Sequence, residues 1–136
     1  MKPGRAPQDG HGSLGQRHLD WSRVVNDRDV DGYRDLVTED LVWIPPAGPP
    51  IVGRAAFGEW LRPFFGSFEY EFTTETIHAI ETAERACERA RFRSRMRPAR
   101  GGSTQEHGGT CIVFWRRDAD GVWRIERYVD EGALRR

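Results

Sequence analysis

The sequence predicts one α+β domain in which N-terminal helices and a curved antiparallel sheet enclose an apolar pocket. Two observations predict this class. Apolar residues recur at helical spacing before Gly66 and alternate with polar residues after it. Because the helices precede the strands and do not alternate with them, the pattern favours α+β over α/β. A chain of 136 residues can bury one core, so we expect a single domain over residues 14–136, after a polar, disordered tail of residues 1–13.

Two amphipathic helices open the predicted domain. Over residues 16–26 the apolar side chains recur at near-helical spacing. Asp29 then caps a second short helix, whose apolar stripe extends to Val37. A brief strand follows over residues 41–44, because the two prolines after it lack the amide hydrogens that a longer strand ladder needs.

A third helix and four longer strands complete the prediction. Gly53 opens the helix after a proline-rich loop, and Pro63 should distort its last turn. The Asp120–Gly121 turn joins the last two strands into a hairpin. The strands are predicted over residues 68–80, 83–97, 105–115 and 122–130.

Arginines occupy every second position along much of the strand over residues 83–97. If this strand pairs antiparallel with the preceding one, the arginines lie across from Glu69, Glu71 and Glu75. Opposite charges paired in this way contribute about 0.2 to 1 kcal/mol each. The row therefore favours a solvated charge ladder over an anion-binding or nucleic-acid-binding patch.

Charge and hydropathy exclude several classes of partner. Positive and negative residues balance at 21 each, so no net field attracts nucleic acid or an acidic lipid surface. No apolar run approaches the ~20 residues that cross a bilayer, and the N-terminal residues lack the apolar core of a secretory signal. We therefore expect a cytoplasmic protein without a membrane partner. Cys87 and Cys111 lie in apolar segments without metal-ligand spacing, which favours free thiols over a disulfide or metal site.

Three segments carry a resemblance to a known family: NDRDVDGYRDLVTEDLVWIPP, GRAAFGEWL and DADGVWRIERYVDEGAL. In this order they resemble the SnoaL-like branch of the nuclear transport factor 2-like superfamily, which includes the ketosteroid isomerases. The resemblance implies a cone-shaped fold with a pocket at its wide end, and a homodimer. It also implies a role among isomerisation, polyketide ring closure, dehydration, epoxide opening and plain ligand binding, since one fold supports many functions.

The resemblance further implies where an isomerase would carry its catalytic groups. By alignment, the carboxylate base falls at Ile44, a tyrosine donor at Trp21 and an acidic donor at Ile112. That mechanism needs a carboxylate base and donors that include a carboxylic acid kept neutral. None of the three side chains supplies this chemistry, so we expect no steroid-isomerase mechanism. Motifs for serine hydrolysis, nucleotide binding and zinc proteolysis are absent from the sequence, and we expect no cofactor or metal.

Four polar side chains are the candidates for catalysis, because alternation and alignment turn them toward the pocket: Glu88, His78, Tyr70 and Arg127. An inward charged group costs several kcal/mol unless it is paired, so it indicates either a partner or a role. Glu88 would transfer a proton, His78 or Tyr70 would donate, and Arg127 would stabilise an anion. The competing interpretation is an ion pair between Glu88 and Arg127.

Aromatic and aliphatic side chains are the candidates for ligand binding, since ligand pockets are mostly apolar with a few placed polar groups. Core packing or a dimer interface explains the same residues. Alternation also turns Val42, Ile44, Thr110 and Ile125 inward. The predicted binding residues are Tyr33, Trp43, Trp60, Phe72, Phe92, Ile112, Phe114 and Trp123.

Two functions remain open from the sequence. The first is a cofactor-independent cyclase, isomerase or dehydratase that acts on an apolar, polyketide-like molecule. The second is a non-catalytic module for ligand binding or dimerisation. A pocket of at least about 300 Å³ with Glu88 unpaired and reachable would favour the enzyme, whereas a filled core with Glu88 locked to Arg127 would favour the module.

Overall fold

The computed structural model describes residues 13–134 and confirms the α+β class. The predicted tail of residues 1–13 lies outside the described residues except for Ser13. The helices are α1 (Leu14–Asn26), α2 (Val30–Asp35) and α3 (Arg54–Ser67), followed after the last strand by a 3₁₀ turn, η3 (Glu131–Leu134). The strands are β1 (Val37–Ile44), β2 (Ile51–Val52), β3 (Phe68–Glu81), β4 (Arg85–Pro98), β5 (Gln105–Arg117) and β6 (Trp123–Asp130).

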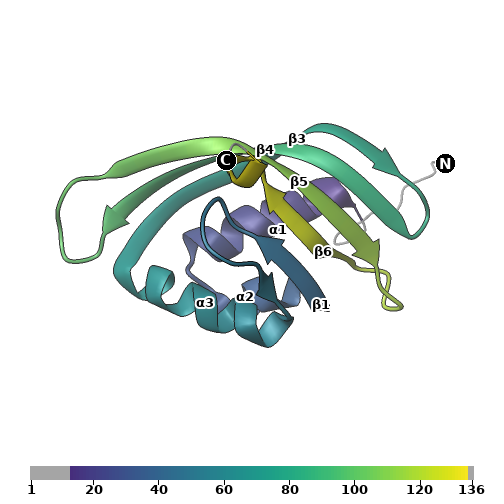
Figure 1. The fold of residues 1–136 in the computed structure, drawn as a ribbon, viewed down its shortest axis with the longest axis horizontal. Coiled ribbons are helices and arrows are strands. Elements are labelled where there is room, and N and C mark those ends of the chain that lie inside the picture. Colours follow the sequence, from purple (N-terminus) through teal and green to yellow (C-terminus); the bar gives the residue numbers. More distant parts are fainter. Residues whose placement is uncertain (1–12, 135–136) are drawn as a thin grey trace.

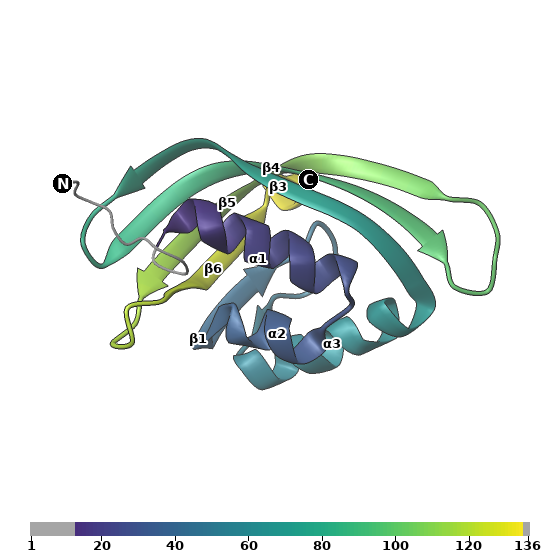
Figure 2. The same ribbon diagram turned by 180° about the vertical axis from the view of Figure 1, so that it is seen from behind.

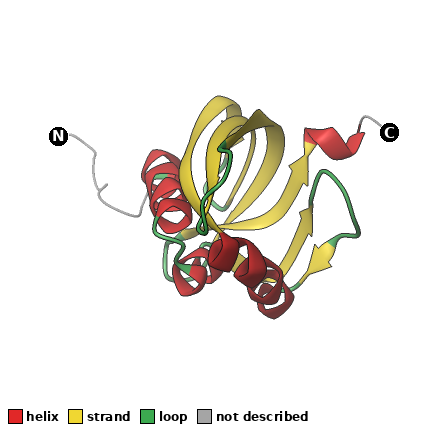
Figure 3. Cartoon of the chain, turned by 90° about the vertical axis from the view of Figure 1, so that its left-hand side faces the viewer, coloured by secondary structure: helices red, strands yellow, loops and turns green. Residues whose placement is uncertain are grey.

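Within the described residues the strands form one sheet of order β2-β1-β6-β5-β4-β3. All neighbours are antiparallel except β1 and β6, which run parallel. The sheet arches over the helices, and α1 lies along its concave side across β3 (Figures 1 and 2). Seen from the side, the strands curl around the space that the helices close (Figure 3). This curvature makes an interior large enough for both a core and a cavity.

The starts of α1 and α2 follow from side-chain caps. Ser13 Oγ accepts a hydrogen bond from the Gln16 amide at 3.0 Å, and Asp29 Oδ1 accepts one from the Gly32 amide at 2.9 Å. The second cap confirms the predicted start of α2. The strand that follows is longer than predicted, because Val37 belongs to β1 and not to the helix.

The predicted charge ladder between β3 and β4 is confirmed. Their register places Glu69 opposite Arg97, Glu71 opposite Arg95 and Glu75 opposite Arg91. Arg91 Nη1 lies 3.2 Å from Glu75 Oε2, and Arg95 Nη1 lies 3.5 Å from Glu71 Oε1. These side chains are largely exposed, so each ion pair contributes little to stability.

The core lies between the three α-helices and the concave face of the sheet. Trp21, Trp115 and Trp123 are almost completely buried in it. Cys111 is buried and Cys87 is half-buried, and both are free thiols, as predicted. None of the described helices is long and apolar enough to span a membrane.

Candidate functional site

A cavity of about 540 Å³ opens between α1, α2, α3 and the inner face of the sheet. Helices and strands both contribute aromatic rings to its wall. The rings that line it are Trp21, Tyr33, Trp43, Trp60, Phe64, Phe65, Tyr70, Phe72, Phe92 and Tyr128.

The aromatic wall is fixed by stacking and by one internal hydrogen bond. Trp43 and Tyr128 stack with ring centroids 3.8 Å apart and planes 9° apart. Trp21 Nε1 donates to the Tyr33 hydroxyl at 2.8 Å. Burial raises the pKa of Tyr33, and it raises the pKa of Tyr70 to about 12. Both phenols therefore stay neutral at physiological pH.

A carboxylate lines the same cavity at the end of β6. Asp130 is 7% exposed, and its two oxygens have different donors. The Tyr128 hydroxyl donates to Oδ2 at 3.3 Å, and the Gly132 amide donates to Oδ1 at 2.8 Å. Burial raises the pKa of Tyr128, so its phenol remains protonated and able to donate. A Cβ at Gly132 would lie 2.9 Å from Oδ1 and 3.2 Å from Pro46 Cβ, so glycine is what permits this close approach.

Glu131, the next residue, also lines the cavity but is held by an arginine. Arg89 Nε lies 2.7 Å from Glu131 Oε2, and Arg89 Nη2 lies 3.1 Å from Oε1. The hydrogen bond and the charge of Glu131 raise the pKa of the Arg89 guanidinium. This two-pronged contact fixes η3 against the sheet.

Glu88 lies outside the cavity, in a closed polar network. It is 1% exposed and contacts three side chains. Trp115 Nε1 donates to Oε2 at 2.6 Å, Thr76 Oγ1 donates to Oε1 at 2.7 Å, and His18 Nε2 lies 2.8 Å from Oε2. Thr74 Oγ1 completes the network 2.6 Å from His18 Nδ1.

The network keeps the Glu88 carboxylate ionised. Burial by itself raises its pKa, but the hydrogen bond and charge of His18, with the hydrogen bonds of Thr76 and Trp115, outweigh burial and leave the pKa below its ordinary value. The predicted partner, Arg127, is wrong, because its side chain is exposed and His18 takes its place. Trp21 lines the cavity and stacks on His18 at 5.7 Å, so one ring contacts both regions.

Six of the predicted site residues line the cavity: Tyr33, Trp43, Trp60, Tyr70, Phe72 and Phe92. The other six do not. Glu88 and Trp123 are buried elsewhere in the core, whereas His78 and Arg127 are exposed. Ile112 and Phe114 occupy the outer face of β5.

Register shifts explain two of these errors. Between β3 and β4, Thr76 pairs with Ala90 but His78 pairs with Arg89, so Ile77 is an extra residue. Between β5 and β6, Ile125 pairs with Trp115 but Arg127 pairs with Phe114. One extra residue reverses the face of every side chain beyond it. The predicted inward positions of His78 and Arg127 are therefore wrong.

On β1, and on β5 from Cys111 onward, the inner face is opposite to the predicted one, whereas Thr110 lines the cavity as predicted. Cys111 and Val113 are buried on β5, as Leu41 and Trp43 are on β1. The predicted inward positions of Ile112, Phe114, Val42 and Ile44 are wrong for this reason.

Sequence reasoning missed His18, Tyr128 and Asp130. His18 lies near the start of α1, and nothing local marks it as the partner of Glu88. Tyr128 and Asp130 carry a weak signal, since an aromatic residue and a carboxylate two positions apart share one face of a strand.

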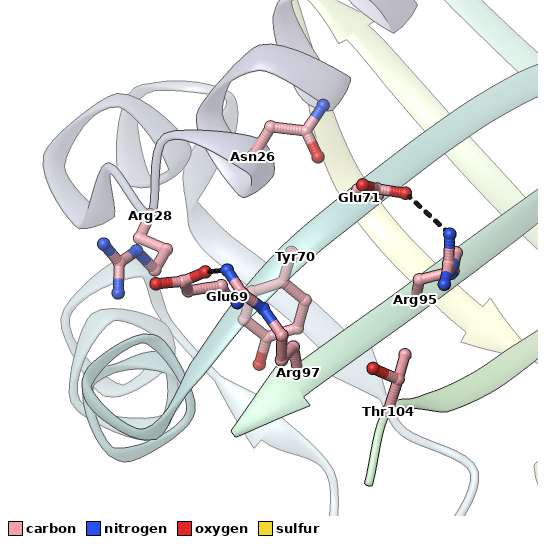
Figure 4. A pocket seen from close by; sticks show the side chains of 8 residues that line it. All are labelled: Asn26, Arg28, Glu69, Tyr70, Glu71, Arg95, Arg97 and Thr104. Atoms are coloured by element: carbon pink, nitrogen blue, oxygen red, sulfur yellow. Dashed lines mark hydrogen bonds and ion pairs between the residues drawn. The ribbon is translucent and has the colours of Figure 1, made fainter. Parts of the chain in front are cut away.

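A second hollow, of about 390 Å³, is polar and adjoins the cavity at Tyr70, which lines both (Figure 4). Its charged side chains are mostly paired: Arg97 with Glu69 and Arg95 with Glu71. Among the described residues, no group of three or more His, Cys, Asp or Glu side chains is arranged to hold a metal ion.

The fold and the aromatic cavity define a class of small α+β domains that enclose an internal pocket. The model of the SnoaL-like domain matches residues 18–128, and the chain belongs to this family. A comparison with curated protein sequences finds no match.

Several solved structures share this fold. A ketosteroid isomerase-like protein from Erwinia carotovora atroseptica has a TM-score of 0.75 at 19% identity, over 86% of this chain and 91% of its own. A proposed scytalone dehydratase from Novosphingobium aromaticivorans has a TM-score of 0.78 at 17% identity, over 86% of this chain and 79% of its own. A nuclear transport factor 2-like protein from Salmonella enterica serovar Typhimurium has a TM-score of 0.71 at 15% identity, over 88% of each chain. At these identities the likeness shows the fold alone.

Proposed function

We propose that the protein is a cofactor-independent enzyme that performs acid–base chemistry, such as isomerisation, dehydration or ring closure, on an apolar small molecule in the aromatic cavity. One observation carries this proposal: the Asp130 carboxylate lines an aromatic cavity of about 540 Å³ and receives hydrogen bonds only from neutral donors among the described residues. A carboxylate in such surroundings is a suitable proton acceptor, because few water molecules compete for it.

The neighbouring phenols give the site its hydrogen-bond donors. Tyr128 donates to Asp130 and orients it, while Tyr70 lines the wall as a neutral phenol. A phenol of this kind can donate to an oxygen on which charge develops. Glu88 has no role in this scheme, because His18, Thr76 and Trp115 already occupy it.

A generic base-catalysed reaction tests the proposal before any natural substrate is identified. In 5-nitrobenzisoxazole, a base removes the ring C–H proton as the N–O bond breaks, and the product is a coloured phenolate with a nitrile. We expect saturable turnover by the wild type, lowered about 100-fold or more by Asp130→Asn, since a positioned base contributes about 10²–10⁴-fold. Glu75→Gln, which removes an exposed carboxylate of the charge ladder, is the matched control and should leave the rate unchanged.

The second candidate function is non-catalytic binding in the same cavity. The closed network around Glu88 favours it, because a buried carboxylate in this chain has all its hydrogen-bond donors among neighbouring side chains and needs no catalytic role to explain it. If 5-nitrobenzisoxazole binds but shows no Asp130-dependent turnover, the result would support this candidate and contradict the enzyme.

A further inference from the structure

The charges around the aromatic cavity are unbalanced. Among the described residues that line it are two carboxylates, Asp130 and Glu131, but neither arginine nor lysine. Its one histidine, His107, is exposed at the rim, with Nε2 2.8 Å from Met96 Sδ. Glu131 is neutralised by Arg89. Asp130 accepts hydrogen bonds from Tyr128 and Gly132 and forms no ion pair with any described residue, so none of the described cations compensates its charge.

The aromatic wall strengthens this imbalance. The face of an aromatic ring is electronegative, and it attracts organic cations within about 6 Å of its centre. Trp43 and Tyr128 stack beside the carboxylate, and Trp60 and Tyr33 lie near Trp43 at 6.4 and 6.0 Å between ring centroids. The ring faces and the Asp130 carboxylate therefore both attract a cation.

Arginines lie close by, in a hollow other than that of Figure 4 which shares part of the cavity wall. They do not reverse the negative charge of the cavity interior. Arg91 pairs with Glu75, and Arg95 pairs with both Glu71 and Glu106. Arg93 is exposed on the strand face that carries the charge ladder. Solvent and paired carboxylates screen such groups, whereas water competes less for the buried charge of Asp130.

We propose that the cavity takes an organic cation: an aromatic or alicyclic body in contact with the rings, carrying a protonated amine that donates to Asp130. This inference deepens the proposed function and rests on it for the location of the ligand. It also makes a carboxylate of the same shape a poor ligand, because two negative charges would then share one apolar space.

Three probes with one ring system test this preference: 1-naphthylmethylamine, 1-naphthalenemethanol and 1-naphthoate, titrated by calorimetry at pH 7. We expect the wild type to bind the amine at least tenfold more tightly than the alcohol, and the carboxylate at least tenfold more weakly. In Asp130→Asn, the amine and the alcohol should bind within about twofold of each other. Glu75→Gln is the matched control for loss of a surface carboxylate and should keep the wild-type order.

The outcomes separate this inference from the proposed function. If the amine and the alcohol bind the wild type equally, or if Asp130→Asn keeps the amine preference, charge selection is refuted while the cavity remains a binding site. If none of the probes binds, the preference for a cation is refuted, and the proposed function is then decided by its own test, the Asp130-dependent turnover of 5-nitrobenzisoxazole. The comparison of probes on the wild type needs no variant, so it stands even if Asp130→Asn does not fold.

Discussion

Replacing Glu88 by Gln removes the charge at the centre of the closed network without changing the size of the side chain. The glutamine can still accept from Trp115 and contact Thr76, so we expect loss mainly of the charge-assisted contact with His18. Hydrogen bonds to charged groups contribute about 1.5–3 kcal/mol. The free energy of unfolding should therefore fall by about 2–3 kcal/mol, measured by urea denaturation at pH 7 with tryptophan fluorescence.

The loss should depend on pH with a defined sign. The folded-state pKa of Glu88 is lowered, so its stabilising contribution is fully present above the ordinary value of 4.5 and disappears as the pH falls through the folded-state value. The difference between the wild type and Glu88→Gln should thus be largest near neutral pH and shrink below about pH 4.5. A difference under about 0.5 kcal/mol at pH 7, combined with loss of turnover, would refute the structural role and restore Glu88 as a catalytic group.

Three further predictions concern other parts of the fold. Asp29→Ala removes the cap of α2 and should cost about 1 kcal/mol in urea denaturation, and an unchanged midpoint would contradict the capping role. Gly132→Ala crowds Asp130 Oδ1, so turnover of the benzisoxazole should fall about tenfold or more while circular dichroism shows a folded chain; unaltered turnover would separate Gly132 from the site. We also expect a homodimer, and size-exclusion chromatography at low and high salt checks it, with a monomer at all protein concentrations as the opposing result.

The sequence was most informative where local chemistry decides the structure. Asp29 marks a helix start because a carboxylate caps free amides, and the alternation of Glu and Arg marks the β3–β4 register because charges avoid the interior. Aromatic residues also led to part of the cavity wall, two of them on helices and four on strands. These signals need only neighbours along the chain.

The orientation of β5 could not be predicted in the same way. Ile112 and Phe114 on one face are as apolar as Val113 and Trp115 on the other, so alternation leaves the inner face undecided. Neither of the extra residues, Ile77 and Glu126, is a glycine or a proline, so the sequence gives no local signal of a bulge at these positions. Contacts such as His18 with Glu88 join residues 70 positions apart, and no local pattern specifies them.

The place of Glu88 relative to the cavity bears on how such a domain acquires new specificities, although the network around it reaches the cavity wall where Thr74 pairs with Phe92. Glu88 precedes Phe92 by four positions on β4, which is about 13 Å along a strand. Substitutions beyond about 10 Å that share no partners usually have additive effects on stability. Cavity residues that contact no member of the network can therefore change while the contacts of Glu88 preserve the fold. Trp21 and Phe92 are exceptions, because Trp21 stacks on His18 and Phe92 pairs with Thr74.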